Sequence, residues 1–219
     1  MGRFSPENVE KAVREAIEKA PKRRFEESVE LQLVLRDINL KDPANRMNKT
    51  LVLPHSPHKN PIKICFIAEG DLALKAKENN VDLILDKAKL QELAGNKREL
   101  KKIAKKYDFF FARADMMPLV GRIMGPILGP RGKMPQPLPP TADPKPNIEL
   151  AKRSIRIRVK NQPIINCKVG HVKQDVKEIV ENIMAVVREV ENFYKKPGVV
   201  RDAYVKTTMG PSVKIKLGG

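Results

Sequence analysis

The first sixty residues carry a helical pattern and then an alternating one. Between residues 5 and 20 the apolar positions recur at helical spacing and form one stripe: Val9, Ala12, Val13, Ala16, Ile17 and Ala20. Ser5 and Pro6 stand where a helix cap and a first-turn proline belong. Alternation then begins, with inward positions at Val29, Leu31, Leu33 and Leu35. We therefore expect a helix over 5–20, a strand around 29–35, a second strand over 49–53 and a proline-rich linker over 54–61.

The middle of the chain has continuous apolar runs in place of alternation. The three runs are Ile62–Ala68, Val81–Leu85 and Phe109–Ala112, and helix-like segments separate them. One such segment, residues 87–106, is rich in Lys, Leu and Ala, which is typical of a solvent-facing helix. Apolar runs that alternate with helices indicate a parallel sheet covered on both faces, so we expect a small βαβαβ domain here.

Residues 118–146 interrupt this regularity. They contain 9 of the 18 prolines and 4 of the 12 glycines of the chain. An ordinary connection takes only about 4–6 residues. The segment is therefore expected to be a second linker or a functional loop.

The last third returns to alternation. Ile155, Ile157 and Val159 point one way, and the residues between them point the other: Arg156, Arg158 and Lys160. A long amphipathic helix is expected from about 175 to 195, and closing strands over 200–207 and 212–217. Because the first and last thirds are each too small for a good core, we expect one discontinuous α+β sandwich-like domain, 1–61 plus 154–219. The segment 62–153 would be inserted into it, and the two crossings would form a hinge.

Charge narrows the class of partner. Lys and Arg number 43 against 26 Asp and Glu, which gives a net charge of +17. Such a surplus attracts polyanions, since neutralising phosphates releases counterions. General solubility in a salty or hot cytoplasm is the plainer alternative. No segment approaches the ~18 apolar residues of a membrane span, and no secretory apolar core opens the chain, so we expect a cytoplasmic protein without a membrane partner.

Enzymatic and metal chemistry find little support in the sequence. The glycine-rich segment around Gly132 and Lys133 resembles a phosphate loop, but Met134 stands where Ser or Thr would hold Mg²⁺. His55 with His58, and Cys167 with His171, have ligand-like spacings. Proline flanks the first pair, and an apolar stretch precedes the second. We therefore expect no enzyme activity, no cofactor and no metal site.

Mixed basic, aromatic and hydroxyl chemistry favours RNA as the polyanion. Phe25 follows Lys22-Arg23-Arg24 and so pairs a stacking ring with phosphate anchors. Thr207 to Ser212 supplies hydroxyls, a thioether and a glycine that permits close backbone approach. Small hydroxyls can bind a 2′-OH, which distinguishes RNA from DNA. A plain hairpin turn is the alternative for this run.

Two segments resemble signatures of the ribosomal protein L-one family, the stalk proteins of the large ribosomal subunit. They are Thr207-Thr208-Met209-Gly210-Pro211-Ser212-Val213 and Leu128-Gly129-Pro130-Arg131-Gly132-Lys133-Met134-Pro135. The segments 24–30 and 53–55 follow in the expected order, so the resemblance, of archaeal type, covers essentially the whole chain. It implies an α+β terminal domain and an inserted Rossmann-like α/β domain.

The resemblance also implies partners and site residues. The partners would be large-subunit ribosomal RNA, deacylated transfer RNA leaving the E site, and the protein's own messenger RNA, bound by a monomer that can repress translation. The residues that match are Arg24, Phe25, Arg158, Lys168, Thr207, Thr208, Met209, Gly210 and Ser212. We expect Arg24 and Arg158 to anchor phosphates and Phe25 to stack on the RNA. The run 208–210 would form a close-packed patch that reads RNA shape.

Two other functions remain open at this stage. An enzyme could use the inserted domain on a nucleotide, although the phosphate-loop residues are missing. A free-standing regulator of messenger RNA would share the same binding chemistry without being part of the ribosome.

Overall fold

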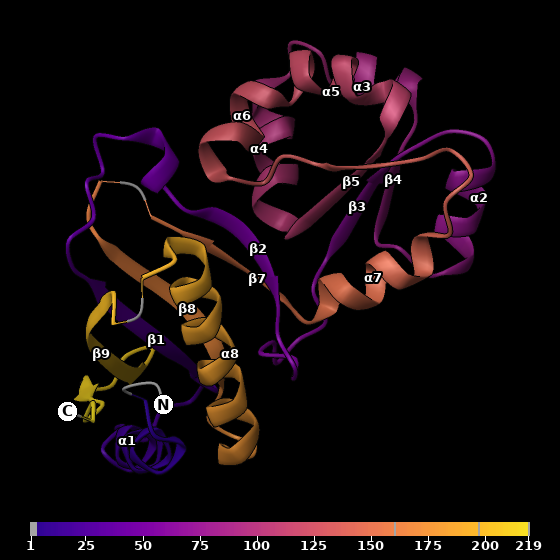
Figure 1. Ribbon diagram of the computed structural model, residues 1–219. Coiled ribbons are helices and arrows are strands. Elements are labelled where there is room, and N and C mark those ends of the chain that lie inside the picture. The colour runs from indigo at the N-terminus through magenta and orange to yellow at the C-terminus, as the bar shows by residue number, and fades with distance from the viewer. Residues whose placement is uncertain (1–3, 160, 197, 219) are drawn as a thin grey trace. The chain divides into compact units, whose positions relative to one another are not determined.

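The computed structural model describes residues 4–159, 161–196 and 198–218. The chain divides into two compact units. The terminal unit comprises residues 1–59 and 153–219, and the inserted unit comprises residues 60–152. Figure 1 labels the helices and strands of both units.

The terminal unit is built on a four-stranded antiparallel sheet with the order β10-β9-β1-β8. These strands are β1 (Ser28–Leu35), β8 (Ile164–His171), β9 (Val200–Thr207) and β10 (Val213–Lys214). Strand β1, from the first third of the sequence, pairs with β8 on one side and β9 on the other, both from the last third. A two-stranded ribbon, β2 (Asn48–Val52) with β7 (Ser154–Arg158), joins the two segments again. Neither segment could form these sheets alone.

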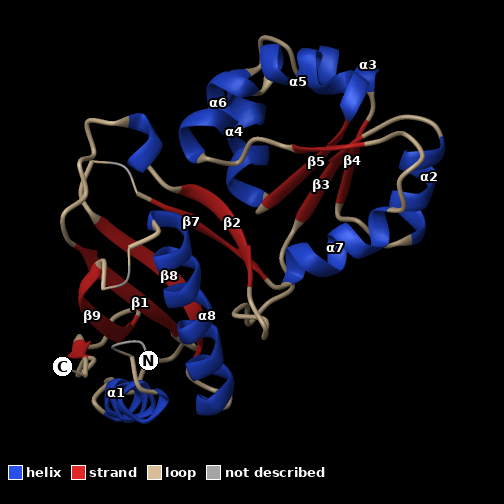
Figure 2. Ribbon diagram, viewed as in Figure 1, coloured by secondary structure: helices blue, strands red, loops and turns tan. Residues whose placement is uncertain are grey.

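Two helices complete this unit, α1 (Pro6–Glu18) and α8 (Val176–Tyr194), with a single 3-10 turn at Pro43–Asn45. The inward positions of β1 are buried in one apolar core with the inner faces of both helices. The alternate positions, such as Glu30 and Gln32, remain partly exposed on the other face. One face of the sheet is therefore covered by helices, as Figure 2 shows, which confirms the predicted α+β class.

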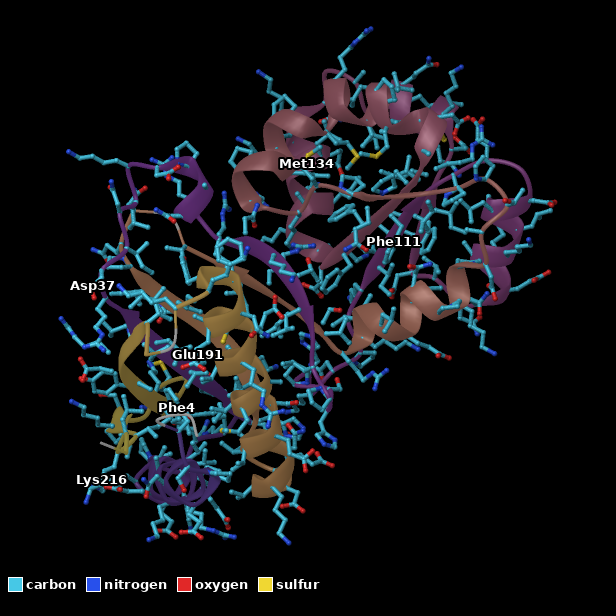
Figure 3. All side chains as sticks on the ribbon, viewed as in Figure 1. Phe4, Asp37, Phe111, Met134, Glu191 and Lys216 are labelled. Carbon is cyan, nitrogen blue, oxygen red and sulfur yellow. The ribbon has the colours of Figure 1, made fainter. Side chains whose placement is uncertain are left out.

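The inserted unit holds a parallel sheet with the order β4-β3-β5-β6. Its strands are β3 (Ile64–Ile67), β4 (Leu83–Leu85), β5 (Phe109–Arg113) and β6 (Gln136–Leu138). Helices α2 (Asp71–Glu78) and α7 (Pro144–Lys152) cover one face. The other face is covered by α3 (Lys87–Glu92), α4 (Lys97–Lys106), α5 (Met117–Ile123) and α6 (Gly125–Arg131), with a 3-10 turn at Ala114–Met116 before α5. Phe111, labelled in Figure 3, lies in the core between sheet and helices, so the predicted three-layer α/β architecture is confirmed.

The expectation of a linker or loop over 118–146 is wrong. This segment forms most of α5, all of α6 and β6, and the start of α7. Its prolines mostly occupy positions that need no amide donor: Pro118 and Pro126 stand in the first turn of a helix, and Pro137 lies on the edge strand β6. Gly132 ends α6 with a φ of +68°, a left-handed conformation that favours glycine.

Four smaller expectations also need correction. The segment 87–106 is two helices, since Gly95 takes a φ of +93° and Asn96 caps α4 by accepting from the amide of Glu99. Ser5 precedes α1, but its hydroxyl makes no capping hydrogen bond. Strand β8 was not predicted, and the closing strand β10 covers only Val213–Lys214.

Among the described residues, no helix is long and apolar enough to cross a membrane.

Candidate nucleic-acid interface

The side chain of Thr208 ties the end of β9 to the start of β1. The amide of Ser28 donates to Oγ1 of Thr208 at 3.2 Å, and the Thr208 amide donates to the Ser28 carbonyl at 3.1 Å. The Thr208 hydroxyl also donates to that carbonyl, at 3.4 Å. The Thr208 side chain thus adds a hydrogen bond between two residues that are 180 positions apart, beyond the end of the β1–β9 ladder.

These two segments carry Phe25 and Met209, which are 53% and 56% exposed. They are the most exposed large apolar side chains among the described residues of the terminal unit. Arg24, also exposed, directly precedes Phe25 and brings a guanidinium to the same segment. Exposed rings and thioethers beside cations suit a nucleic acid, whose bases and sugars offer apolar faces between phosphates.

Gly210 is required by a close contact with Thr207, not by its backbone angles. Thr207 is fully buried, and the Gly210 amide donates to its carbonyl at 3.2 Å. A Cβ placed on Gly210 would lie 2.2 Å from Oγ1 of Thr207. The run 207–210 therefore folds back tightly on itself, with Thr207 beneath it and Met209 exposed above.

Glu26, next to Phe25, gathers cations from two other segments. Its carboxylate lies 2.7 Å from Nζ of Lys59, 3.3 Å from Nδ1 of His171 and 3.6 Å from Nζ of Lys173. The hydrogen bond from Lys59 is the main cause that lowers the pKa of Glu26 below its ordinary value of 4.5; Lys173 and His171 add to the effect, and desolvation opposes it. The carboxylate thus fixes two lysines beside the exposed ring.

Replacing Glu26 by glutamine should lower the melting temperature at pH 7 and have no effect at low pH. Because the pKa of Glu26 is lowered in the folded state, its stabilisation is present above 4.5 and is lost as the pH falls through the folded-state value. Thermal unfolding of both proteins from pH 7 down to pH ~3 would measure this. Glu149→Gln, on an exposed position of α7, is the matched control. A Glu26→Gln difference that stayed constant with pH would contradict the assignment.

Buried polar atoms without hydrogen bonds gather at this same end of the terminal unit. Among the described residues they belong to Glu27, His171, Gln174 and Thr207. His171 pairs with Ser28 across the sheet, Thr207 pairs with Val29, and the Glu27 carbonyl accepts from the amide of Val172. Two of these groups have charged neighbours, since Nδ1 of His171 lies 3.3 Å and Nε of Arg23 lies 3.4 Å from the carboxylates of Glu26 and Glu27, respectively.

A cavity of about 420 Å³ opens beside Phe25. Lys22, Arg23, Arg24, Lys59 and Lys173 line it, above the carboxylates of Glu26 and Glu27. Nε of Arg23 lies 3.4 Å from the buried Glu27 carboxylate. Cations therefore outnumber carboxylates around the cavity, which makes it attractive to phosphate groups.

Three predicted site residues, Ser212, Lys168 and Arg158, lie on other segments of the terminal unit than Phe25. Ser212 is exposed just before β10. Lys168 lies opposite Glu30 on the uncovered face of the sheet, and Lys206 lies on the other side of the same glutamate.

Arg158 lies at the opposite end of the terminal unit. It pairs with Asn48, near Asn45, whose carbonyl accepts from the hydroxyl of Tyr194 at the C-terminal end of α8. The Ser28–His171 pair instead precedes the N-terminus of α8, a helix about 28 Å long. The structure does not bring Arg158 to Phe25, and its RNA contact stays a prediction.

Three residues of this site had no role assigned from the sequence. Glu26 and Ser28 lie in the segment 24–30 that carries the resemblance, but their contacts, like those of Lys59, are with distant segments. Only the pairing of β1 with β9, which sets residue 28 beside residue 208, could have identified Ser28.

The histidines take part in ordinary contacts. Nε2 of His55 lies 2.7 Å from the Glu181 carboxylate, and Nε2 of His58 lies 3.1 Å from the Ser154 carbonyl. Burial raises the pKa of the Cys167 thiol to about 12, which keeps it protonated. Within the described part of the chain, no three His, Cys, Asp or Glu side chains are grouped to hold a metal ion.

Known proteins are similar to this chain over most of its length. A profile of the ribosomal protein L1p/L10e family matches residues 11–211. A protein of Thermofilum pendens is 46% identical over 95% of this chain and 92% of its own length, and one of Archaeoglobus fulgidus is 46% identical over 94% and 95%. One of Methanopyrus kandleri is 43% identical over 97% and 99%, and all three are named large ribosomal subunit protein uL1. This is a family of ribosomal proteins, not of enzymes. The archaeal-type resemblance is thereby confirmed, and the chain belongs to the ribosomal protein L1p/L10e family.

Proposed function

We propose that this protein is a constituent of the large ribosomal subunit and binds its ribosomal RNA through one end of the terminal unit. The interface comprises Arg24, Phe25 and the run 207–210. The observation that carries the proposal is the Thr208–Ser28 link. It joins the segments that carry the two most exposed large apolar side chains among the described residues of the unit. The names of the relatives, large ribosomal subunit protein, support the same assignment.

The chemistry of this end suits a folded RNA. Arg24 and the lysines around the cavity supply charge for phosphates, while Phe25 and Met209 supply surface for sugars and bases. Charge alone would attract any polyanion. The compact, nearly uncharged run 207–210 therefore offers the better basis for selectivity, because a rigid surface accepts only an RNA of complementary shape.

Replacing Phe25 by alanine should weaken binding to large-subunit ribosomal RNA about tenfold, since stacking on an aromatic ring contributes about 1–3 kcal/mol per base. Phe193→Ala is the matched control. Phe193 is also exposed, at 37%, but it stands next to Tyr194 at the C-terminal end of α8. Filter binding or calorimetry with an rRNA fragment would compare them. Equal losses from both variants would show that Phe25 has no special place in binding.

Within the large subunit, we propose that this protein forms a mobile stalk, which assists release of deacylated transfer RNA from the E site. The chain passes between the two units twice, at residues 59/60 and 152/153, and two such crossings are a suitable construction for a mobile part. We further propose that the protein represses translation by binding a similar site on its own messenger RNA. Ribosomes lacking the protein should release E-site transfer RNA more slowly, and an rRNA fragment should compete with the messenger for the same protein.

A free-standing regulator of messenger RNA remains the alternative. Sedimentation separates the two roles, since a subunit constituent travels with large subunits at high salt. A footprint on large-subunit ribosomal RNA would define the site. A protein that sediments alone and leaves no footprint would overturn the ribosomal assignment.

A further inference from the structure

The positive charge of the inserted unit is concentrated in one helix. Residues 60–152 contain 17 Lys and Arg and 11 Asp and Glu, a net charge of +6. Helix α4 has six basic residues and one acidic residue among ten, a net charge of +5. The rest of the unit is therefore nearly neutral, at +1.

Solubility does not explain this helix. The exposed face of α1, also amphipathic, carries four Glu and only two basic residues. In α4, by contrast, basic residues stand four apart in four pairs: 97/101, 98/102, 101/105 and 102/106. Like charges at this spacing repel and destabilise a helix. Cations in the first turn, here Lys97 and Arg98, also oppose the helix dipole.

The basic side chains of α4 are available for a partner. Leu100 and Ala104 face the core, while all six basic residues are exposed. Lys102 pairs with Glu99 at 2.7 Å. Arg98, Lys101 and Lys105 have no acidic partner within the described part of the chain.

A groove runs along one side of this helix. It measures about 500 Å³ and lies between α4 and the helices α5 and α6. Lys97, Lys101 and Arg122 form its charged rim, and the apolar part of its lining includes Leu100, Ile123 and Ile127. Cations above an apolar floor fit phosphates flanking the sugar edges of a nucleic acid strand.

We propose that α4 and this groove form a second RNA-binding surface, which takes the phosphate backbone of a duplex segment. The proposal rests on the proposed function of the chain. Residues four apart on a helix are separated by about 6 Å along its axis, close to the separation of successive phosphates in a strand. Lys97, Lys101 and Lys105 therefore form a ladder that matches the backbone. The contact carries charge and little sequence information.

The test compares two triple variants of the full-length chain with equal loss of charge. The first, Lys97→Gln, Lys101→Gln and Lys105→Gln, removes the lysine ladder of α4. The control, Lys75→Gln, Lys77→Gln and Lys145→Gln, lies on α2 and α7, which cover the other face of the same sheet. The affinity of each for large-subunit ribosomal RNA is measured over a salt series.

The α4 variant should bind about tenfold more weakly at moderate salt, and its plot of log affinity against log salt should be flatter by about three. The control should stay near the unmodified protein. Equal changes in both variants would overturn the proposal while leaving the Phe25 interface intact. Loss of binding by Phe25→Ala no greater than by Phe193→Ala would instead remove the proposed interface at Phe25, and absence of both co-sedimentation and footprint would remove the proposed function.

A second readout needs no substitution. RNA should protect Lys101 and Lys105 of the unmodified protein from acylation, and leave Lys75 and Lys77 reactive. Unprotected α4 lysines in an otherwise bound complex would overturn the proposal, and would leave an acidic protein as the partner for this helix.

Discussion

Replacing Gly210 by alanine should destabilise the protein by about 1–3 kcal/mol, an effect typical of an extra methyl group forced into a packed site. The new Cβ would lie 2.2 Å from Oγ1 of Thr207. Thr207 is fully buried, and its branched side chain has few alternative rotamers. The run 207–210 must therefore open, and Met209 must move with it. We expect RNA affinity to fall together with stability.

The cause can be isolated by a double mutant. Thr207→Ala removes the hydroxyl that the new methyl group would meet, so adding it to Gly210→Ala should restore part of the loss. Gly121→Ala is the control, because a Cβ at that position meets nothing within 4 Å. Denaturant unfolding and RNA affinity would be measured for all four variants. Additive losses in the double mutant would show that Thr207 does not impose the glycine.

The sequence predicted elements whose buried faces follow a regular period. Strand β1 and helix α8 are examples, since the period of each follows from a single core face. Strand β8 was missed because its period breaks. The β1–β8 register shifts between Val29 and Glu30, and the neighbours Val169 and Gly170 are both buried. An irregularity of this kind disturbs alternation and cannot be read from one strand alone.

The prediction of a linker or loop over residues 118–146 was wrong for a different reason. Prolines were counted as breakers, yet Pro118 and Pro126 begin helices, where their missing amide costs nothing. A count of proline does not show its position relative to a helix start. The sequence is limited in the same way at the candidate site, because it does not show contacts between distant segments. Phe25 and the run 207–210 carried a recognisable signature, but Ser28 became visible only through a hydrogen bond across 180 positions.

Replacing Thr208 by valine should lower the affinity for large-subunit ribosomal RNA by ten- to a hundredfold, or about 1.4–2.8 kcal/mol. Valine has nearly the shape of threonine but no hydroxyl. It would leave the Ser28 amide, which now donates to Oγ1 of Thr208 at 3.2 Å, without an acceptor in a part-buried site. An unsatisfied group of this kind costs about 1–3 kcal/mol. The two segments that carry Phe25 and Met209 would then be joined at this point by the backbone hydrogen bond alone.

Thr208→Ser is the matched control, because it keeps the hydroxyl and should keep most of the affinity. The affinity of each variant is measured for a cognate stem-loop and a scrambled one across a salt series. If the run 207–210 reads RNA shape, Thr208→Val should lose affinity mainly for the cognate RNA, with little change in the salt slope, since no phosphate contact is removed. A valine variant that bound the cognate RNA as tightly as the unmodified protein would show that selectivity does not depend on the hydroxyl of Thr208, which is the atom that bonds the Ser28 amide.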